Sequence, residues 1–456
     1  MVKFVVILLF LLIFVLFRSF NRYYYGRDAL APLSFFVLFF FLTRIPRLIL
    51  AENNIYHPQQ YITDDMIWLY FVIMSFFLLA VLIGGIFNAQ ITAKDTYGNS
   101  FGLDYYNSHS KLVNYSSMFR VGIVCFLIGA ASRIFLIEKA GGILYIWSNL
   151  QRRAFMLSGY GYLGYLSLCI TFGLAAIEIY VLNCKKYKGI FMILCFIGIM
   201  LNLSFGARSP VIKMLLGLFF VYWYASPNKI NWKHFIKIKY AIIVIVVLFT
   251  IKVMPTFRTY DFQFNAKSFA NVLNNSSNNI GSIFNEISTY DEDVFVFDYF
   301  SKNPFWNGKS YLGLLTAWLP RSFFAKKSPV DDGMYLRALM KGYHVEPPMT
   351  IEELGAKSDL SSVPFTSTGI LYANFGIVGI IVGGMLIGFI LVSQYQKMLK
   401  NNFMLDDILL YQFLCIRLTL STKGLVELFM TIIIIKVFCG LIYKMSNVQK
   451  NVVLQR

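Results

Sequence analysis

Charged residues are scarce in this sequence, and closely paired cysteines are missing. Only 14% of the 456 residues are charged and four are histidines, a composition that excludes a water-soluble enzyme. No CxxC pair occurs, so neither a zinc site nor a disulfide framework is expected. The six cysteines stand almost entirely inside apolar runs: Cys125, Cys169, Cys184, Cys195, Cys415 and Cys439.

What the sequence has instead is long apolar runs. Apolar residues make up 57% of the chain, and its mean hydropathy is +0.62. We predict an all-α, polytopic integral membrane protein with about eleven transmembrane helices. The first run lacks the small residues of a signal-peptide cleavage site, so it is expected to be retained as a span. The spans are expected near residues 2–17, 30–50, 66–87, 118–137, 162–183, 189–205, 210–225, 240–254, 366–393, 404–420 and 424–445.

Basic residues predict how these helices are oriented. The net charge of +18 would suggest nucleic acid in a soluble chain, but here most of it serves topology, and we expect no nucleic-acid partner. Lysine and arginine concentrate in every second connection, which predicts an outer N-terminus and an inner C-terminus. These connections are residues 18–27, 94–120, 185–188, 229–239, 397–400 and 444–456.

The same topology divides the chain into three parts. Residues 1–254 form a first bundle of about eight spans, and residues 366–456 add about three more. Residues 255–365 form one large outer loop. A loop of this length without secondary structure would be unusual, so short helices folded over the membrane face are expected in it.

Arginines on the outer side run against the usual rule that basic residues stay inside. Guanidinium is the preferred bidentate partner of phosphate, so they suggest a negatively charged, phosphorylated lipid substrate. The alternative is pairing with acidic residues of the large loop, above all for Arg258 and Arg337. The outer arginines are Arg44, Arg47, Arg133, Arg152, Arg153, Arg208, Arg258, Arg321, Arg337 and Arg417.

The turn from Leu203 to Lys213 concentrates features of an anion site. Ser209 can act as an N-cap with Pro210 as the first helical residue, so unpaired N–H groups and the positive end of a helix dipole lie beside Arg208. The alternative is that Arg208 only extends to the interface next to a short turn.

Three segments resemble a known family. Gly206-Ala-Arg-Ser-Pro210, Trp318-Leu-Pro-Arg-Ser-Phe-Phe-Ala-Lys-Lys-Ser-Pro329 and Thr366-Ser-Thr-Gly-Ile-Leu-Tyr-Ala-Asn-Phe-Gly-Ile-Val-Gly379 are similar to segments of the Wzy-type oligosaccharide repeat-unit polymerases, also called O-antigen polymerases. Their order and the overall topology carry the resemblance more than their letters do.

The resemblance implies a metal-independent membrane glycosyltransferase of lipopolysaccharide or related surface-polysaccharide biosynthesis, without cofactors. It would act at the periplasmic face of the bacterial inner membrane, as a multi-pass protein in contact with membrane lipid. Its substrates would be undecaprenyl-pyrophosphate-linked oligosaccharides, with the growing glycan moved from its lipid pyrophosphate to a new lipid-linked unit. A chain-length regulator protein would be a further partner.

By the same resemblance, Arg208 and Arg321 bind the pyrophosphate and stabilise its departure. Other residues are assigned to substrate binding: Arg152, Arg153, Arg258, Lys327, Tyr160 and Tyr162. For Arg152 and Arg153 an interfacial anchor is the alternative. Lys327 precedes Ser328-Pro329 and so departs from the family's Lys-Pro pattern.

A catalytic base is expected in the large loop, where His344 is the only histidine. A water-facing turn is the alternative for His344, and several carboxylates compete with it for this role: Glu286, Asp291, Glu292, Asp293, Glu352 and Glu353. Asp291-Glu-Asp293 looks like the metal-binding DxD of sugar-nucleotide transferases, but those donors belong to the cytoplasm, so we predict no metal site there.

Two other functions stay open. An O-antigen ligase would use the same lipid donor and a similar architecture. A flippase for lipid-linked repeat units should carry charges at mid-membrane depth. Lys436 is the most deeply placed candidate. The concentration of polar residues at one face favours a membrane-surface enzyme.

Overall fold

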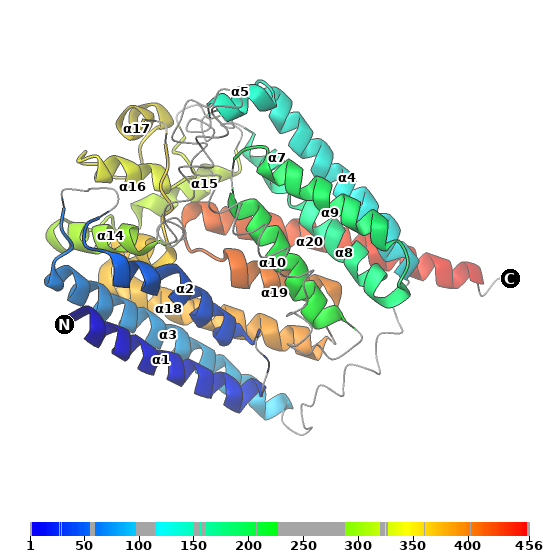
Figure 1. Cartoon of the computed structure of the whole chain (residues 1–456), viewed down its shortest axis with the longest axis horizontal. Coiled ribbons are helices and arrows are strands. Elements are labelled where there is room, and N and C mark those ends of the chain that lie inside the picture. Colours follow the sequence, from blue (N-terminus) through cyan, green and yellow to red (C-terminus); the bar gives the residue numbers. More distant parts are fainter. Residues whose placement is uncertain are drawn as a thin grey trace. The chain divides into compact units, whose positions relative to one another are not determined.

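The computed structural model describes residues 2–26, 28, 30–54, 60–96, 115–149, 156, 160–206, 208–226, 288–319, 324, 327–359, 361–401 and 403–453. Within these residues every regular element is a helix, apart from an isolated bridge between Asn53 and Tyr61. The chain divides into two compact units. Each is described below by itself, with the helix labels of Figure 1.

Unit 1 comprises Met1–Ser100, Ile280–Gln396 and Leu418–Glu427. Its long helices are α1 (Val2–Tyr25), α2 (Pro32–Leu50), α3 (Asp64–Thr96) and α18 (Ser367–Lys400), drawn in blue and orange in Figure 1. Short helices lie between α3 and α18 in the sequence: α14 (Tyr290–Lys302), the 3-10 helix η5 (Lys309–Leu312), α15 (Gly313–Ala317), α16 (Gly333–Met340) and α17 (Ile351–Ser358).

Aromatic rings fill the contacts among the first three helices of unit 1. Phe10 of α1 is buried and meets Phe71 of α3 edge-to-face, with ring centroids 5.2 Å apart. Phe40 of α2 also meets the Phe10 ring edge-to-face, with ring centroids 6.4 Å apart. Such edge-to-face pairs add to the stabilisation that burial gives. At one end of this group, the Lys3 ammonium donates to the carbonyl of Ala51, just after α2.

Helix α18 bends at Gly376, whose backbone is non-helical with φ 59° and ψ −144°. A positive φ is accessible to glycine at little cost. The carbonyl groups of Ala373 and Asn374 next to the bend accept hydrogen bonds from the backbone N–H groups of Trp306 and Asn307, each at 2.9 Å. The bend therefore anchors the segment between α14 and η5 to the spanning helix.

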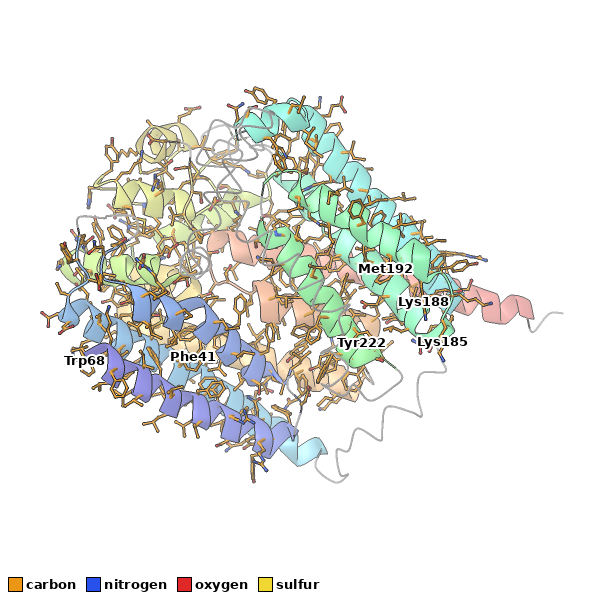
Figure 2. The ribbon with its side chains drawn as sticks, in the orientation of Figure 1. Phe41, Trp68, Lys185, Lys188, Met192 and Tyr222 are labelled. Atoms are coloured by element: carbon orange, nitrogen blue, oxygen red, sulfur yellow. The ribbon has the colours of Figure 1, made fainter. Side chains whose placement is uncertain are left out.

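Unit 2 comprises Phe101–Asn279, Lys397–Arg417 and Leu428–Arg456. Its helices are α4 (Tyr115–Lys139), α5 (Ile143–Ser148), α7 (Gly161–Leu166), α8 (Cys169–Cys184), α9 (Lys188–Leu203), α10 (Arg208–Ala225), α19 (Leu405–Arg417) and most of α20 (Thr422–Val453). Helices α4 and α8 pack closely, since a Cβ at Gly173 would lie 2.5 Å from the Gly122 carbonyl oxygen. Figure 2 shows Lys185 and Lys188 together at the turn between α8 and α9.

Seven of the described helices are long and apolar enough to cross a bilayer. They are Val2–Tyr25, Pro32–Leu50, Asp64–Ile91, Tyr115–Lys139, Gly161–Cys184, Ser367–Lys400 and Thr422–Met445; Lys188–Leu203 and Ser209–Ala225 are shorter apolar helices. The predicted span at residues 240–254 lies outside the described residues. The predicted class, a helical multi-pass membrane protein, is confirmed, whereas the count of eleven stays a prediction.

Helix ends that the charge pattern assigns to one side lie together within each unit. In unit 2, the Arg133 guanidinium near the end of α4 donates to the carbonyls of Leu201 and Asn202 at the end of α9. In unit 1, Tyr395 near the end of α18 donates to Asp28, just after α1. The first ends are predicted to be outer and the second inner; below, "outer end" means the end predicted to be outer.

Candidate functional site

A small open pocket lies among the outer ends of α8, α10 and α19 in unit 2. It is shallow and open to solvent. Half of its lining residues are apolar, and the others carry two cationic side chains, an amide and a hydroxyl. The lining residues are Leu168, Thr171, Phe172, Lys213, Gln412, Phe413, Ile416 and Arg417. A pocket of this composition suits an anion that also carries hydroxyl groups.

Its two cations come from helix ends. Lys213 lies five residues after the start of α10 at Arg208, and Arg417 is the last residue of α19. Thr171 lies in the first turn of α8. Because all three ends are predicted to be outer, the charges belong near one membrane surface, where long cationic side chains are tolerated.

Gln412 supplies a buried acceptor at this pocket. Its side chain is 4% exposed, and its Oε1 has no hydrogen-bond partner among the described residues. The side chain fits against α10 because residue 217 is glycine; a Cβ there would lie 2.3 Å from Gln412 Oε1. A buried acceptor without a partner is costly, and a ligand hydroxyl would relieve that cost.

The turn before α10 contains a glycine with a positive φ. Gly206 has a φ of 59°, and its N–H donates to the Leu203 carbonyl at 2.8 Å. Helix α10 begins at Arg208, so Pro210 lies within its first turn instead of starting it. Arg208 and Lys213 therefore share the first two turns of one helix.

Tyr160 and Tyr162, at the start of α7 in unit 2, differ in burial. Tyr160 is half-buried against the apolar cluster formed by Leu136, Ala140, Ile146 and Phe205, whereas Tyr162 is exposed. Arg133 stacks on Phe205 at 4.5 Å and pairs with helix-end carbonyls, so its position is explained by packing and capping.

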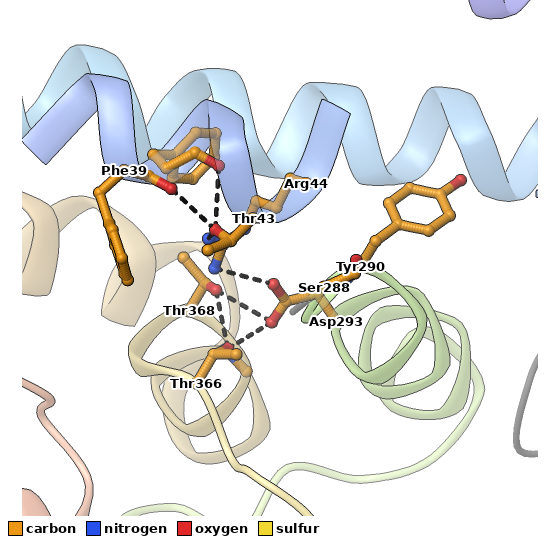
Figure 3. Close-up of polar contacts among 10 residues, drawn as sticks. Phe39, Thr43, Arg44, Ser288, Tyr290, Asp293, Thr366 and Thr368 are labelled. Carbon is orange, nitrogen blue, oxygen red and sulfur yellow. Dashed lines mark hydrogen bonds and ion pairs between the residues drawn. The ribbon is translucent and has the colours of Figure 1, made fainter. Parts of the chain in front are cut away.

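Two further outer arginines have buried carboxylate partners in unit 1, and Figure 3 shows the contacts of one of them, Arg44. Arg44 of α2 pairs with Asp293 of α14 at 3.1 Å, and Arg47 pairs with Asp291 at 3.0 Å. Thr368 Oγ1 donates to Asp293 at 3.0 Å, and Thr366 Oγ1 also donates to this carboxylate. The network ties α14 to α2 and to the start of α18.

Burial raises the pKa of Asp293, although Arg44 and the two threonines act in the opposite direction. Removing one partner of such a buried pair leaves an uncompensated charge, so both arginines are accounted for without a substrate. Among the described residues, no group of three His, Cys, Asp or Glu is arranged to hold a metal ion.

Lys327 and His344, both in unit 1, occupy contrasting surroundings. Lys327 is buried, and its Nζ lies 2.5 Å from the Leu319 carbonyl oxygen and 3.4 Å from those of Thr316 and Ala317. His344 is exposed, with Nδ1 3.2 Å from the Tyr299 hydroxyl. Glu346, two residues further on, pairs with Lys309. In this arrangement Lys327 stabilises the end of α15, and His344 is accessible.

The remaining predicted site residues are not described. Arg152, Arg153, Arg258 and Arg321 lie outside the described residues, and so does the side chain of Arg208. Lys213 and Arg417 were visible in the sequence as cations near outer ends, but nothing in the sequence indicated that they share a pocket. Gln412 gave only a weak signal, as a polar residue in a mainly apolar helix.

Lys436, the candidate for a charge along a transport path, has a partner. Its Nζ lies 2.9 Å from Asp406 Oδ2 at the start of α19. The pair lies near the ends predicted to be inner.

No protein family, characterised protein or solved structure shows a significant match to this chain.

Proposed function

We propose that this chain polymerises undecaprenyl-pyrophosphate-linked oligosaccharide repeat units at the periplasmic face of the bacterial inner membrane. The observation that carries the proposal is the pocket that joins Lys213, Arg417 and the buried acceptor of Gln412. Two cations fit a pyrophosphate, and the amide oxygen fits a sugar hydroxyl. A lipid-linked sugar pyrophosphate combines both groups in one molecule.

In the proposed reaction, a hydroxyl oxygen of the new lipid-linked unit attacks the anomeric carbon of the growing glycan. The bond from that carbon to the pyrophosphate oxygen breaks, and the electron pair leaves with undecaprenyl pyrophosphate. The hydroxyl proton passes to a general base.

The cations act on the leaving group. Lys213 and Arg417 hold the pyrophosphate. The assignment of Arg208 and Arg321 to the pyrophosphate by resemblance stays a prediction. Preorganised positive charge stabilises the departing pyrophosphate more than the bound substrate, which lowers the barrier. Losing one such donor costs about 3 kcal/mol, or roughly a hundredfold in rate.

Two alternatives use the same substrate class. An O-antigen ligase would transfer the glycan to lipid A core, and a flippase would carry the lipid-linked unit across the membrane. A flippase is less favoured, because Lys436 is paired with Asp406 near the inner ends.

The test is a glycan ladder from a bacterial strain that assembles the matching repeat unit and lacks this gene. Wild-type complementation should restore the ladder. Lys213→Ala and Arg417→Ala should leave mainly glycolipid with one repeat unit, a loss of polymerisation of roughly a hundredfold. The matched controls are Lys188→Ala and Arg120→Ala, which remove exposed cations elsewhere in unit 2 and should keep a full ladder.

Each other outcome contradicts a defined part of the proposal. Full ladders from both pocket variants, at wild-type protein levels, would remove the pocket from the site. If the strain without the gene carried no capped lipid and accumulated lipid-linked units, ligase or flippase would replace polymerase. Units on the outer leaflet would then indicate a ligase, and units on the inner leaflet a flippase.

A further inference from the structure

Helix α15 and its flanking residues present a row of large apolar side chains in the segment predicted to be an outer loop. Leu315 is 76% exposed, and Leu312 and Trp318 are each 48% exposed. Leu319 is 46% exposed. A spacing of three or four residues puts these side chains on one face. A contiguous exposed patch of this kind marks a surface that something else covers.

The other side of this segment is held to unit 1. The Tyr311 hydroxyl donates to the Leu420 carbonyl at 2.8 Å, and Thr422 Oγ1 donates to the Ser310 carbonyl at 3.2 Å. Gly313 lies against Thr422 at the start of α20. These contacts fix the orientation of α15. Because they hold its other side against unit 1, the apolar face points away from the protein.

The apolar face continues onto the surface of a spanning helix. Tyr311 stacks on Phe375 of α18, with ring centroids 6.1 Å apart and planes 8° apart. Phe375 is exposed just before the bend at Gly376, and beyond the bend Val378 and Val382, four residues apart, are exposed on one face of α18. Since α18 is long and apolar enough to cross the membrane, this stripe faces lipid.

The carbonyl groups at the end of α15 are paired with a side chain of the protein itself. Lipid offers no hydrogen-bond donors, so carbonyl groups at a helix end in the membrane must be paired inside the protein. The buried ammonium of Lys327 lies within 3.4 Å of three such carbonyl oxygens, those of Thr316, Ala317 and Leu319.

We infer that α15 is an interfacial helix that docks on the lipid bilayer. Leu312, Leu315 and Trp318 enter the boundary between headgroups and acyl chains, in the leaflet at the Ser367 end of α18. The occupant of this face is bilayer lipid. The Lys309–Glu346 pair then holds the His344 segment at the membrane surface. The inference does not depend on the proposed reaction.

Tryptophan fluorescence of the full-length protein in nanodiscs tests this docking. The difference between wild type and Trp318→Phe gives the emission of Trp318. Phospholipids brominated on the acyl chains near the headgroup should quench this emission, and aqueous acrylamide should quench it poorly. Trp306→Phe is the matched control, because Trp306 is buried in unit 1 and its emission should respond to neither quencher.

A second variant changes the apolar face without touching the core. Leu315→Glu replaces the most exposed of these side chains and should reduce lipid quenching of Trp318. Unchanged quenching in this variant would contradict the docking. So would quenching of Trp318 by acrylamide alone, which would put α15 in water, or protection from both quenchers, which would put a protein surface on it.

Discussion

Asp331 and Asp332 are neighbours in the chain, but their carboxyl groups meet opposite electrostatic surroundings. Burial raises the pKa of Asp331, yet the Lys423 ammonium, 3.0 Å away, the Ser362 hydroxyl and the Gly333 N–H together outweigh burial and leave that pKa below its ordinary value. Asp332 is also buried and accepts the N–H of Thr422 at 2.6 Å. Burial raises the pKa of Asp332 from its ordinary value of 3.8 to about 7.

The raised pKa of Asp332 predicts a pH dependence of stability. A carboxyl group with a higher pKa in the folded state binds its proton more tightly there, so ionisation destabilises the fold. The stability from this group is complete below about pH 4 and is lost as pH rises towards about 7. Asp332→Asn keeps an oxygen for Thr422 and cannot ionise. The melting temperature of wild type in detergent should therefore fall, relative to that of Asp332→Asn, as pH rises through that window.

Asp331→Asn is the matched control. A pKa below the ordinary value contributes stability that is present above that value and is lost only as pH falls through the folded pKa. Asp331→Asn keeps the Asp332 carboxyl, so its melting temperature should also fall relative to Asp332→Asn as pH rises. Its window should lie slightly lower, because the Asp331 charge that helps to raise the pKa of Asp332 is gone. A difference between wild type and Asp332→Asn that did not change with pH would contradict the assignment.

At the scale of helices, α3 and α18 meet at backbone contact through glycines. A Cβ at Gly388 would lie 2.0 Å from the Val81 carbonyl oxygen, and a Cβ at Gly84 would lie 2.1 Å from that of Met385. Gly384 and Gly388 stand four residues apart on α18, a spacing typical of close helix packing in membranes. Side chains at these positions would push the helices apart.

Gly388→Ala should therefore destabilise the protein. The added methyl group has only backbone atoms to displace, so a loss of about 1–3 kcal/mol in the free energy of unfolding is expected. Gly440→Ala in α20 is the matched control, because no described atom lies within 4 Å of the added Cβ and alanine is the better helix former. Unfolding midpoints in a detergent titration measure both, and equal midpoints would show that α3 and α18 do not pack this closely.

The sequence could predict helices but not their partners. An apolar run predicts a helix wherever it lies, so residues 30–50 correspond closely to α2 (Pro32–Leu50). The partner of a helix depends on contacts between distant residues. Arg44 and Asp293 are 249 residues apart, and no local pattern joins them. For the same reason the outer arginines suggested a substrate, whereas Arg44, Arg47 and Arg133 have partners within the protein.

The candidate site shows the same limit. Lys213 and Arg417 could be placed near outer ends from hydropathy alone. Their pocket depends on α10 and α19 approaching at Gly217 and Gln412, and the single amide gave no periodic signal. The bend of α18 at Gly376 was equally hidden, because a glycine in an apolar run is common in spanning helices.

At the scale of the whole molecule, each unit is assembled from separated stretches of the chain. Unit 1 takes Met1–Ser100, Ile280–Gln396 and Leu418–Glu427, and unit 2 takes the two stretches between them and Leu428–Arg456. The division into residues 1–254, 255–365 and 366–456 concerns membrane sidedness instead, and it stays a prediction. Both units agree in one respect: ends that the charge pattern assigns to the same side lie together.

The membrane sidedness can be tested with two exposed positions that are predicted to lie on opposite faces of the membrane. Lys188 lies at a turn that is predicted to be inner and His344 on the side that is predicted to be outer, with α9, α10 and the predicted span at residues 240–254 between them. A membrane-impermeant maleimide should therefore label His344→Cys in intact cells and Lys188→Cys only after permeabilisation, with wild type giving the background of its own cysteines. Labelling of both from outside would mean that residues 240–254 do not cross. Labelling of Lys188→Cys alone would place the Lys213–Arg417 pocket in the cytoplasm, where the proposed substrate transfer does not occur.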